Sequence, residues 1–533
     1  MTTILILGAG IMQEPAVRIA RRKGWRVILA DGNPNAPARE MADQFECIDL
    51  KDRHGLLAFA RSTRERSGLD GVFTAGTDFS TSVAWIAANL GLPGISFDTA
   101  MKATDKCLMR EAFASAGVPS PLFSSWSGRG DPGASLLPGM VFPLVVKPVD
   151  NMGARGVKRV DDTTELAQAC HAALPLSQSS RVIIEEFMEG PEFSLDAIVH
   201  KGTVTVCGVA DRLIRFPPSF VEMGHTMPTD IGAETVGALE DVFIAGIRAI
   251  GIDNGAAKGD IKLTAKGPMV GEIAARLSGG YMSGWTFPLS SGVEVTEAAL
   301  NIAVGLPPGN LAPRVQRVCA ERALISVPGI IQDVDGAEEA RKTIGVEEIF
   351  LRIAPGDTVV FPSNNVQKCG NVLTVADRRD EAESAASRAL GLFQIRLRPL
   401  VSATSIHLFR PDAHDCFESL PHEVRSSINA MPAFRGAPAL TDWDAPIPIE
   451  CPPGWDRCRQ KDWHGLEFAD SARLAWARGG GSILPIEGRD DFQVCGMFWK
   501  AFVRGGHQGG VYVLDSIRAA ARRGVLKEFL AGP

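Results

Sequence analysis

The sequence FPLVVKPVDNMGARGVKRV, residues 142–160, decides how the rest of this chain is interpreted. A short apolar run leads into Lys147, and a loop with two glycines follows from Asn151 to Gly156. A lysine in a buried strand is costly unless an anion compensates its charge. Two interpretations are open. Either the side chain reaches solvent at a strand edge, or it binds an anion such as a triphosphate, with the loop's N–H groups folded over it.

The residues before this segment alternate between strand and helix patterns. Apolar runs predict strands at 4–7, 27–30 and 71–75, and apolar periodicity predicts helices at 14–23, 80–90 and 104–116. Strands that alternate with helices indicate a parallel sheet covered on both faces.

The first strand ends in Gly8-Ala9-Gly10, and Asp31 ends the second strand. This arrangement is similar to a dinucleotide fingerprint, in which glycines let the backbone approach a pyrophosphate. The third glycine of that fingerprint is missing, because Pro15 and its neighbours occupy its place. The sequence therefore favours a tight turn over NAD binding.

The residues after the glycine loop contain a second pattern with chemical meaning. Two short strands, 259–263 and 269–273, are separated by a turn and predict an antiparallel hairpin. Such a hairpin brings Asp260 and Glu272 side by side, where their like charges require a cation such as Mg²⁺. Arg276 follows four residues later and is suited to neutralise charge on a transferring phosphoryl group. The alternative is a pair of exposed carboxylates with surface partners.

The last third of the chain is less informative. A strand at 319–327, a β-rich stretch and a helix at 381–390 are expected before residue 400. Five of the nine tryptophans lie after residue 400. Three roles are open for them: packing on the preceding domain, forming a homodimer surface, or lining the substrate pocket. A separate structural module is the favoured interpretation. Cys451, Cys458 and His464 lie close in sequence, but their spacing matches no standard zinc pattern.

Composition limits the possible partners and location. The 533 residues predict three or four domains, and 45% hydrophobic with 22% charged residues is typical of a soluble globular protein. The net charge of −7 with scattered basic residues indicates neither nucleic acid nor a membrane as a partner. MTTILILGAG at the N-terminus is expected to be a buried strand rather than a signal peptide. Ten cysteines without a CxxC pair favour reduced thiols and a cytoplasmic location.

Four segments together resemble the ATP-grasp superfamily over roughly residues 1–400. They are the opening segment, ATDKCLMREAFASAGVPSP (103–121), VIIEEFMEGPEFSLD (182–196) and GDIKLTAKGPMVGEIAARLSGG (259–280). The resemblance implies an α/β fold in four parts. These are a Rossmann-like pre-ATP-grasp domain (1–95), a two-part ATP-grasp domain (96–310), a small β-rich lid (311–400) and an α+β C-terminal extension (401–533).

The resemblance also implies roles for individual residues. The residues that contact ATP phosphates or close over them are Lys106, Lys147, Asn151, Gly153 and Gly156. The strand that meets the adenine is formed by Glu185, Glu186, Phe187 and Met188, and Glu192 holds the ribose. Asp260 and Glu272 coordinate Mg²⁺ or Mn²⁺, while Arg276 and Lys147 are catalytic.

Two details point to different branches of the superfamily. Many members have Asn two residues after the second acidic ligand, and Ala274 stands there, as in the purine-pathway carboxylases. DRLIRFPPSFVEMGHTMP (211–228) is similar to the E-x-x-H region of the L-amino-acid ligases. Glu222 is suited to a substrate ammonium and His225 to a carboxylate or a proton in transit. A solvated glutamate and a turn-stabilising histidine are the alternative.

The glycines after Arg276 also resemble the ligase branch. The backbone amides of Ser278, Gly279 and Gly280 are candidates to hold an acyl phosphate, with a plain turn as the alternative. We therefore predict an enzyme that converts a carboxylate to an acyl phosphate on Mg-ATP and passes the acyl group to an amine, such as an amino acid. The rival hypotheses are a bicarbonate-using carboxylase, an NAD-dependent oxidoreductase and a non-catalytic nucleotide sensor.

Overall fold

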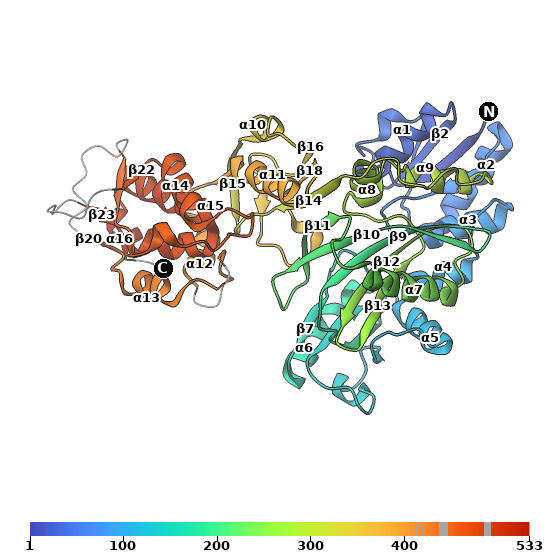
Figure 1. The fold of residues 1–533 in the computed structure, drawn as a ribbon, viewed down its shortest axis with the longest axis horizontal. Helices are drawn as coiled ribbons and strands as arrows, with labels where there is room; N and C mark the ends of the chain where they lie inside the picture. The colour runs from blue at the N-terminus through green and yellow to red at the C-terminus, as the bar shows by residue number, and fades with distance from the viewer. Residues whose placement is uncertain (411–413, 418, 436–445, 484–491, 532–533) are drawn as a thin grey trace. The chain divides into compact units, whose positions relative to one another are not determined.

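The structure is a computed structural model that describes residues 1–410, 414–417, 419–435, 446–483 and 492–531. It contains two compact units (Figure 1). The N-terminal unit comprises residues 1–321 and 375–379, and the C-terminal unit comprises 322–374 and 380–533. The finer division at residues 95, 310 and 400 stays a prediction. Within the described ranges, we find no helix with the length and apolarity that a membrane span needs.

The N-terminal unit begins with a parallel sheet in the order β3-β2-β1-β4. Its strands are β1 (Thr3–Leu7), β2 (Arg26–Asp31), β3 (Gln44–Cys47) and β4 (Gly71–Phe73). Alternate residues of β1 pack against opposite helices, because side chains along a strand point to opposite faces. Ile4 and Ile6 pack on the side of α1 (Glu14–Arg22), whereas Leu5 and Leu7 pack on the side of α2 (Arg53–Ser67) and α3 (Ser80–Leu90). The predicted sheet with two covered faces is confirmed.

The helix predicted at 104–116 is wrong at its start. Thr104 ends the preceding helix α4 (Phe97–Thr104), and α5 spans Lys106–Ala116. Between them Asp105 has an extended backbone, and its carboxylate accepts hydrogen bonds from the N–H groups of Cys107 and Leu108. This side chain satisfies two N–H groups that a helix leaves without partners, so the new helix begins at Lys106.

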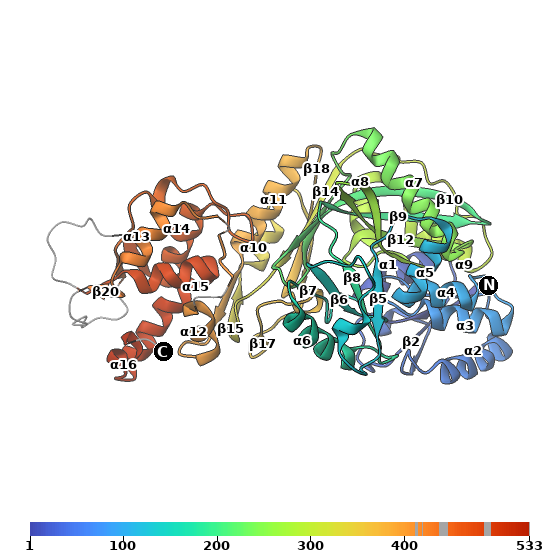
Figure 2. The ribbon, with the colours of Figure 1, turned by 90° about the horizontal axis from the view of Figure 1, so that it is seen from below.

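An antiparallel sheet with the order β5-β8-β6-β7 carries the glycine loop. The strands are β5 (Phe123–Trp126), β6 (Leu144–Pro148), β7 (Lys158–Val160) and β8 (Val182–Glu186). Helix α6 (Thr163–Ala173) lies beside them, as Figure 2 shows, and its Leu166 and Cys170 share a core with Val146 and Ile184.

The acidic hairpin belongs to long antiparallel strands in the order β13-β12-β9-β10-β11. The strands are β9 (Glu192–His200), β10 (Thr203–Arg215), β11 (Val221–Met227), β12 (Gly255–Thr264) and β13 (Gly267–Ala274). Helix α7 (Ala233–Ile250) covers one face through Leu239, Phe243 and Ile247. It begins at Ala233 and ends at Ile250, where Gly251 follows in the left-handed conformation. Helices α8 (Phe287–Ser291) and α9 (Val295–Ala303) complete this part.

The C-terminal unit joins the predicted lid region to the extension. Its elements up to residue 397 are the end of β14 (Val318–Leu324), β15 (Gly329–Asp335), α10 (Ala337–Arg341), β16 (Val346–Leu351), β17 (Thr358–Val359), β18 (Gly370–Ala376), α11 (Arg379–Leu392) and β19 (Gln394–Leu397). The later elements are α12 (Ser402–Phe409), α13 (His422–Ala430), β20 (Phe434–Arg435), β21 (Ile447–Ile449), α14 (Phe468–Gly479), β22 (Gly481–Ile483), β23 (Gln493–Val494), α15 (Gly496–Arg522) and α16 (Leu526–Leu530).

One hydrophobic core runs through both parts of this unit. Leu324, Ile331 and Phe393 from the lid region are buried in the same cluster as Trp499 and Phe502 from the extension. We expected the extension to be a module of its own. Residues on both sides of residue 400 bury their apolar surface together, so the shared core does not support that interpretation.

Candidate active site

The hairpin of β12 and β13 brings the two predicted metal ligands together. Asp260 lies directly opposite Glu272, and the register shifts by one residue immediately afterwards. Gly271 is the extra residue of this bulge, and a Cβ there would lie 3.0 Å from the carbonyl oxygen of Asp260. Directly opposite residues of an antiparallel pair point to the same face, so the carboxylates face the same side.

Glu272 is an ionised carboxylate that is open to a ligand. Burial opposes its charge, but the positive charges of Lys106, Lys258 and Arg276 outweigh that effect and lower the pKa of Glu272 to about 2. Among the described residues its nearest cation is Lys106, with 3.7 Å between Nζ and Oε2, and its side chain is 32% exposed. Asp260 accepts a hydrogen bond from Ser194 and is paired with Lys258 and Arg212.

A buried arginine that the sequence interpretation missed holds this hairpin in place. Arg110, on α5, donates a hydrogen bond to the carbonyl oxygen of Gly271. It also lies 2.8 Å from the carboxylate of Glu185, and both side chains are almost fully buried. No sequence pattern marks Arg110, because its partners lie far away along the chain.

The two predicted phosphate-binding lysines lie beside Glu185 and Glu272. Lys147 donates to Glu185 at 2.6 Å, and Lys106 donates to the carbonyl oxygen of Asn151 at 2.9 Å. Burial opposes the charge of Glu185, and Arg110 and Lys147 together hold its pKa below the usual range. Glu185 is therefore the buried counter-ion of Lys147, which answers how a lysine is tolerated inside this sheet.

The loop from Asn151 to Gly156 has the conformation that its glycines permit. Gly153 and Gly156 have φ of 67° and 72°, and Ala154 between them has φ of 60°. A Cβ at Gly156 would lie 2.8 Å from a methyl carbon of Leu176, so the backbone passes close to that side chain. The position requires glycine for its dihedral and for its space.

The predicted adenine strand divides into two parts. Glu185 is buried with its cations, so its side chain is committed to the ion pairs described above. The N–H groups of Glu186 and Phe187 donate to the carbonyl oxygens of Leu122 and Pro143. The ring of Phe187 lies beneath the guanidinium of Arg159, 4.9 Å from its centroid. The adenine contact of Glu186, Phe187 and Met188 stays a prediction.

A second missed arginine links three predicted site residues. Arg212, on β10, pairs with Glu192, with Glu222 at 2.9 Å and with Asp260 at 2.9 Å. Burial disfavours its charge, but these three carboxylates raise the pKa of Arg212 well above its usual value. The residues predicted to bind the ribose, the substrate and the metal, which are Glu192, Glu222 and Asp260, thus all pair with one guanidinium.

A bulge on β11 aligns the two predicted amino-acid ligands. His225 lies opposite Arg212, whereas Glu222 lies opposite Ile214, so one extra residue stands between them. Two residues three apart in a regular strand point to opposite faces, and this extra residue turns both to one face. His225 is buried, 2.8 Å from Thr286 Oγ1 and 3.4 Å from Glu321. Contact of its ring with a substrate stays a prediction.

In the segment after β13, the polar groups of Ser278 are bonded within the protein. Ser278 is buried, its hydroxyl donates to Asp196 at 2.6 Å, and its N–H donates to Ser283. The amide of Ser278 is therefore already bonded, which leaves Gly279 and Gly280 as candidates to hold an acyl phosphate. Arg276 lies 3.7 Å from Asp78.

The N-terminal glycine turn uses its own aspartate. Asp31 accepts hydrogen bonds from the N–H groups of Ala9 and Asn33, both at 2.8 Å. Gly8 has φ of 100°, which explains the glycine in this turn. The carboxylate that a dinucleotide ribose would need is bonded within the turn, which is the tight turn that the sequence favoured.

The residues present fit Mg-ATP. Glu272 is an ionised, partly exposed carboxylate that accepts no hydrogen bond from the described residues, and oxygen ligands of this kind suit Mg²⁺. Lys106, Lys147 and Lys258 place positive charge around it, as a polyphosphate requires.

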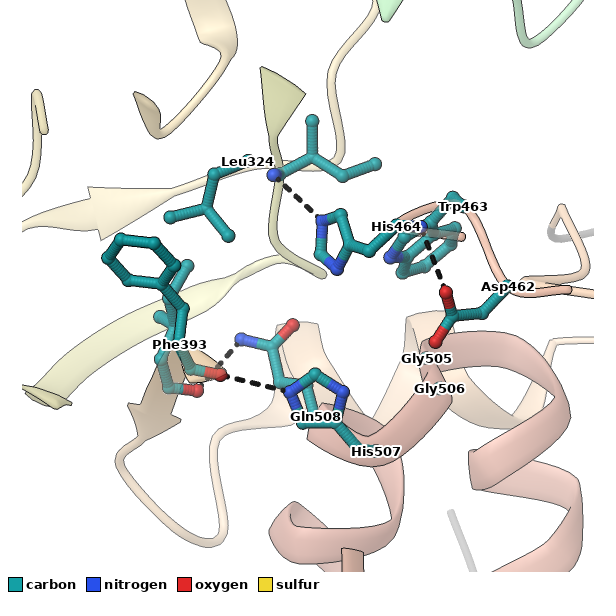
Figure 3. A pocket seen from close by; sticks show the side chains of 11 residues that line it. Leu324, Phe393, Asp462, Trp463, His464, Gly505, Gly506, His507 and Gln508 are labelled. Carbon is teal, nitrogen blue, oxygen red and sulfur yellow. Dashed lines mark hydrogen bonds between the residues drawn. The ribbon is translucent and has the colours of Figure 1, made fainter. Parts of the chain in front are cut away.

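The C-terminal unit holds a separate small cavity, shown in Figure 3. Two buried histidines face it, His464 from the loop before α14 and His507 from α15, where Gly506 breaks the helix with φ of 56°. Nε2 of His464 accepts from the N–H of Ile325, so its proton lies on Nδ1. Nε2 of His507 faces the carbonyl oxygen of Phe393 at 3.3 Å and must carry the proton.

These histidines predict a pH-dependent stability. Burial lowers the pKa of His464 to about 3 and that of His507 to about 4, whereas the unfolded chain binds these protons near pH 6.5. The free energy of unfolding therefore falls as the pH drops from 6.5 to 4. Burial raises the pKa of Asp462 to about 6, which acts in the opposite direction below that pH. The three groups leave a net slope of about 1.4 kcal/mol per pH unit.

Urea unfolding of the full chain between pH 7 and pH 4.5 measures the contribution of His507 as the difference in slope between the wild type and a variant. His507→Gln should reduce the slope of stability against pH, because glutamine binds no proton in either the folded or the unfolded chain. His422→Gln, at an exposed histidine on α13, is the matched control and should leave it unchanged. An equal slope in the wild type and in His507→Gln would contradict the prediction.

Comparison with known proteins supplies independent information on these regions. Residues 140–284 match the ATP-grasp domain family, and residues 322–398 match the family described as L-amino acid ligase C-terminal domain 2. The crystal structure of L-amino acid ligase from Bacillus licheniformis has a TM-score of 0.66 at 24% identity and covers 75% of this chain and 99% of that chain. The predicted α/β fold with an ATP-grasp domain is confirmed.

Two relatives extend the likeness in sequence. Uncharacterized protein y4rH of Sinorhizobium fredii is 28% identical over 381 residues, which are 70% of this chain and 78% of that protein. Carnosine synthase 1 of Homo sapiens is 27% identical over 330 residues, which are 57% of this chain and 40% of that protein. This chain therefore spans less than half the length of the human relative.

Proposed function

We propose that this chain, whose residues 140–284 match the ATP-grasp domain family, activates a small carboxylate as an acyl phosphate and transfers the acyl group to an amine. The observation that carries the proposal is the pair Asp260 and Glu272, opposite each other on one hairpin, with Lys106 3.7 Å from Glu272. The second substrate is an amino acid in this proposal, supported by the shared face of Glu222 and His225.

The chain's own residues would act mainly by positioning and by neutralising charge. Lys106 and Lys147 would hold the phosphates of ATP, each already anchored by one protein oxygen. Arg276 would face the carboxylate as it attacks the γ-phosphate, and the negative charge that develops there would be balanced by its guanidinium. Closure of the loop from Asn151 to Gly156 would exclude water from the acyl phosphate.

The metal has a limited role in this proposal. Asp260 and Glu272 would hold Mg²⁺ or Mn²⁺, which supplies positive charge to the phosphate oxygens. Ala274 provides no third ligand, so fewer protein atoms would coordinate the metal than in members that have Asn at this position. Ten free thiols are typical of a reducing compartment, and we place the reaction in the cytoplasm.

A test measures ADP release by the purified full chain. We expect ADP release when pairs of amino acids are added with Mg-ATP, and a product that contains both substrates in mass spectra. Bicarbonate should give no stimulation when it is the only carboxylate. ADP release that depends on bicarbonate alone would overturn the ligase in favour of the carboxylase hypothesis.

A further inference from the structure

A cavity in the N-terminal unit lies beside Arg276. It has a volume of about 70 Å³ and lies between β4, α3, the start of β12 and α9. Most of its wall is apolar, formed by Phe73, Val83, Ile95, Ala299 and Ile302. We call it the Arg276 cavity.

The wall of the Arg276 cavity combines the positive charge of Arg276 with the apolar side chains. Arg276 lines the cavity, and its Nε is buried and donates no hydrogen bond to any described residue. The carboxylate oxygen Oδ1 of Asp78 lies 3.7 Å from the same Nε. A guanidinium with an unused donor suits a carboxylate, and a carboxylate beside it suits an ammonium.

We infer that the Arg276 cavity receives the side chain of the carboxylate substrate, which is an α-amino acid with a short branched aliphatic side chain. The inference rests on the proposed function, because it assigns the acyl donor of the same site. Arg276 contacts the donor's carboxylate, Asp78 contacts its ammonium, and the aliphatic carbons lie against Phe73 and Ile302.

The size of the cavity sets the size of the side chain. One water needs about 10–15 Å³ of such volume, so 70 Å³ accommodates roughly five atoms of that size. The four carbons of a leucine side chain fit this space, and an aromatic ring does not. One missing or extra methylene in a hydrophobic pocket changes kcat/KM by about 10-fold to 200-fold.

Two substitutions change the cavity in opposite directions. Ala299→Val narrows it and should lower kcat/KM for leucine as donor by about 10-fold or more, with little change for alanine. Val83→Ala widens it and should admit phenylalanine. Ala298→Val is the matched control, because Ala298 is buried on the same helix but does not line the cavity.

A third substitution tests the ammonium. Asp78→Asn should raise the KM for leucine about 10-fold or more and leave the KM for 4-methylpentanoate unchanged, because only leucine carries the ammonium. Equal changes for both donors would overturn the role of Asp78. The assay is ADP release by the full chain, with one amine acceptor in excess.

The outcomes separate this inference from the proposed function. ADP release with an unchanged ratio of leucine to alanine in both Ala299→Val and Val83→Ala would overturn the cavity assignment and leave the ligase intact. No ADP release by the wild type with any donor would overturn the proposed function, and the inference with it. If Ala299→Val does not fold, Val83→Ala decides alone.

Discussion

Glu272→Gln is expected to reduce ADP release by about 10³-fold, the upper range for removing one preorganised electrostatic group from an active site. The carboxylate is ionised at neutral pH, since its pKa is about 2, and it faces Asp260 across the hairpin. The amide that replaces it has nearly the same shape but no charge. The measurement is ADP release at saturating Mg-ATP and donor, with Mg²⁺-dependent nucleotide binding measured by calorimetry.

Glu234→Gln is the matched control, because Glu234 is exposed on α7. It should leave ADP release unchanged. Folding of Glu272→Gln is checked by its melting temperature, since the variant leaves Lys106 without a carboxylate at 3.7 Å. Unaltered turnover in the folded variant would count against the metal assignment as a whole.

Arg110→Met is expected to destabilise the N-terminal unit by about 3–5 kcal/mol, the usual effect of removing one partner from a buried ion pair. The substitution leaves Glu185 buried with Lys147 as its remaining cation. It also removes the hydrogen bond to the carbonyl oxygen of Gly271, which positions the bulge before Glu272. Differential scanning calorimetry of the full chain measures the loss.

Two further variants make this result specific. Arg248→Met, at an exposed arginine on α7, should change stability by less than about 0.5 kcal/mol. Lys147→Met keeps the pair of Arg110 and Glu185, so it should cost less stability than Arg110→Met and instead weaken ATP binding. If Arg110→Met and Arg248→Met have the same melting temperature, the buried pair of Arg110 and Glu185 is not required for folding.

The acidic hairpin was predictable because it is local. Two short strands and a turn determine that Asp260 and Glu272 approach each other, and the structure pairs them directly. Lys147 was found for a similar reason, since a charged residue within an apolar run stands out in any sequence. The bulge at Gly271 was not predictable, because Arg110, which donates to its carbonyl oxygen, is far away along the chain.

The packing partners of the extension, residues 401–533, were also not predictable from the sequence. Its tryptophans and its change of composition indicated a separate module, since neither feature reveals a partner. The aromatic ring of Trp499 and the side chain of Leu324 belong to one core, although they are far apart in the sequence. Burial of apolar surface does not depend on sequence separation.

By itself the sequence determined the order of the elements, the acidic hairpin and the lysine inside an apolar strand. These properties follow from periodicity, turn residues and the cost of burying a charge, all of which act over a few residues. Only the tertiary structure revealed Arg110, Arg212 and the Arg276 cavity. Ion pairs and cavities form between segments that folding brings together, and their energies depend on distances that no local pattern contains.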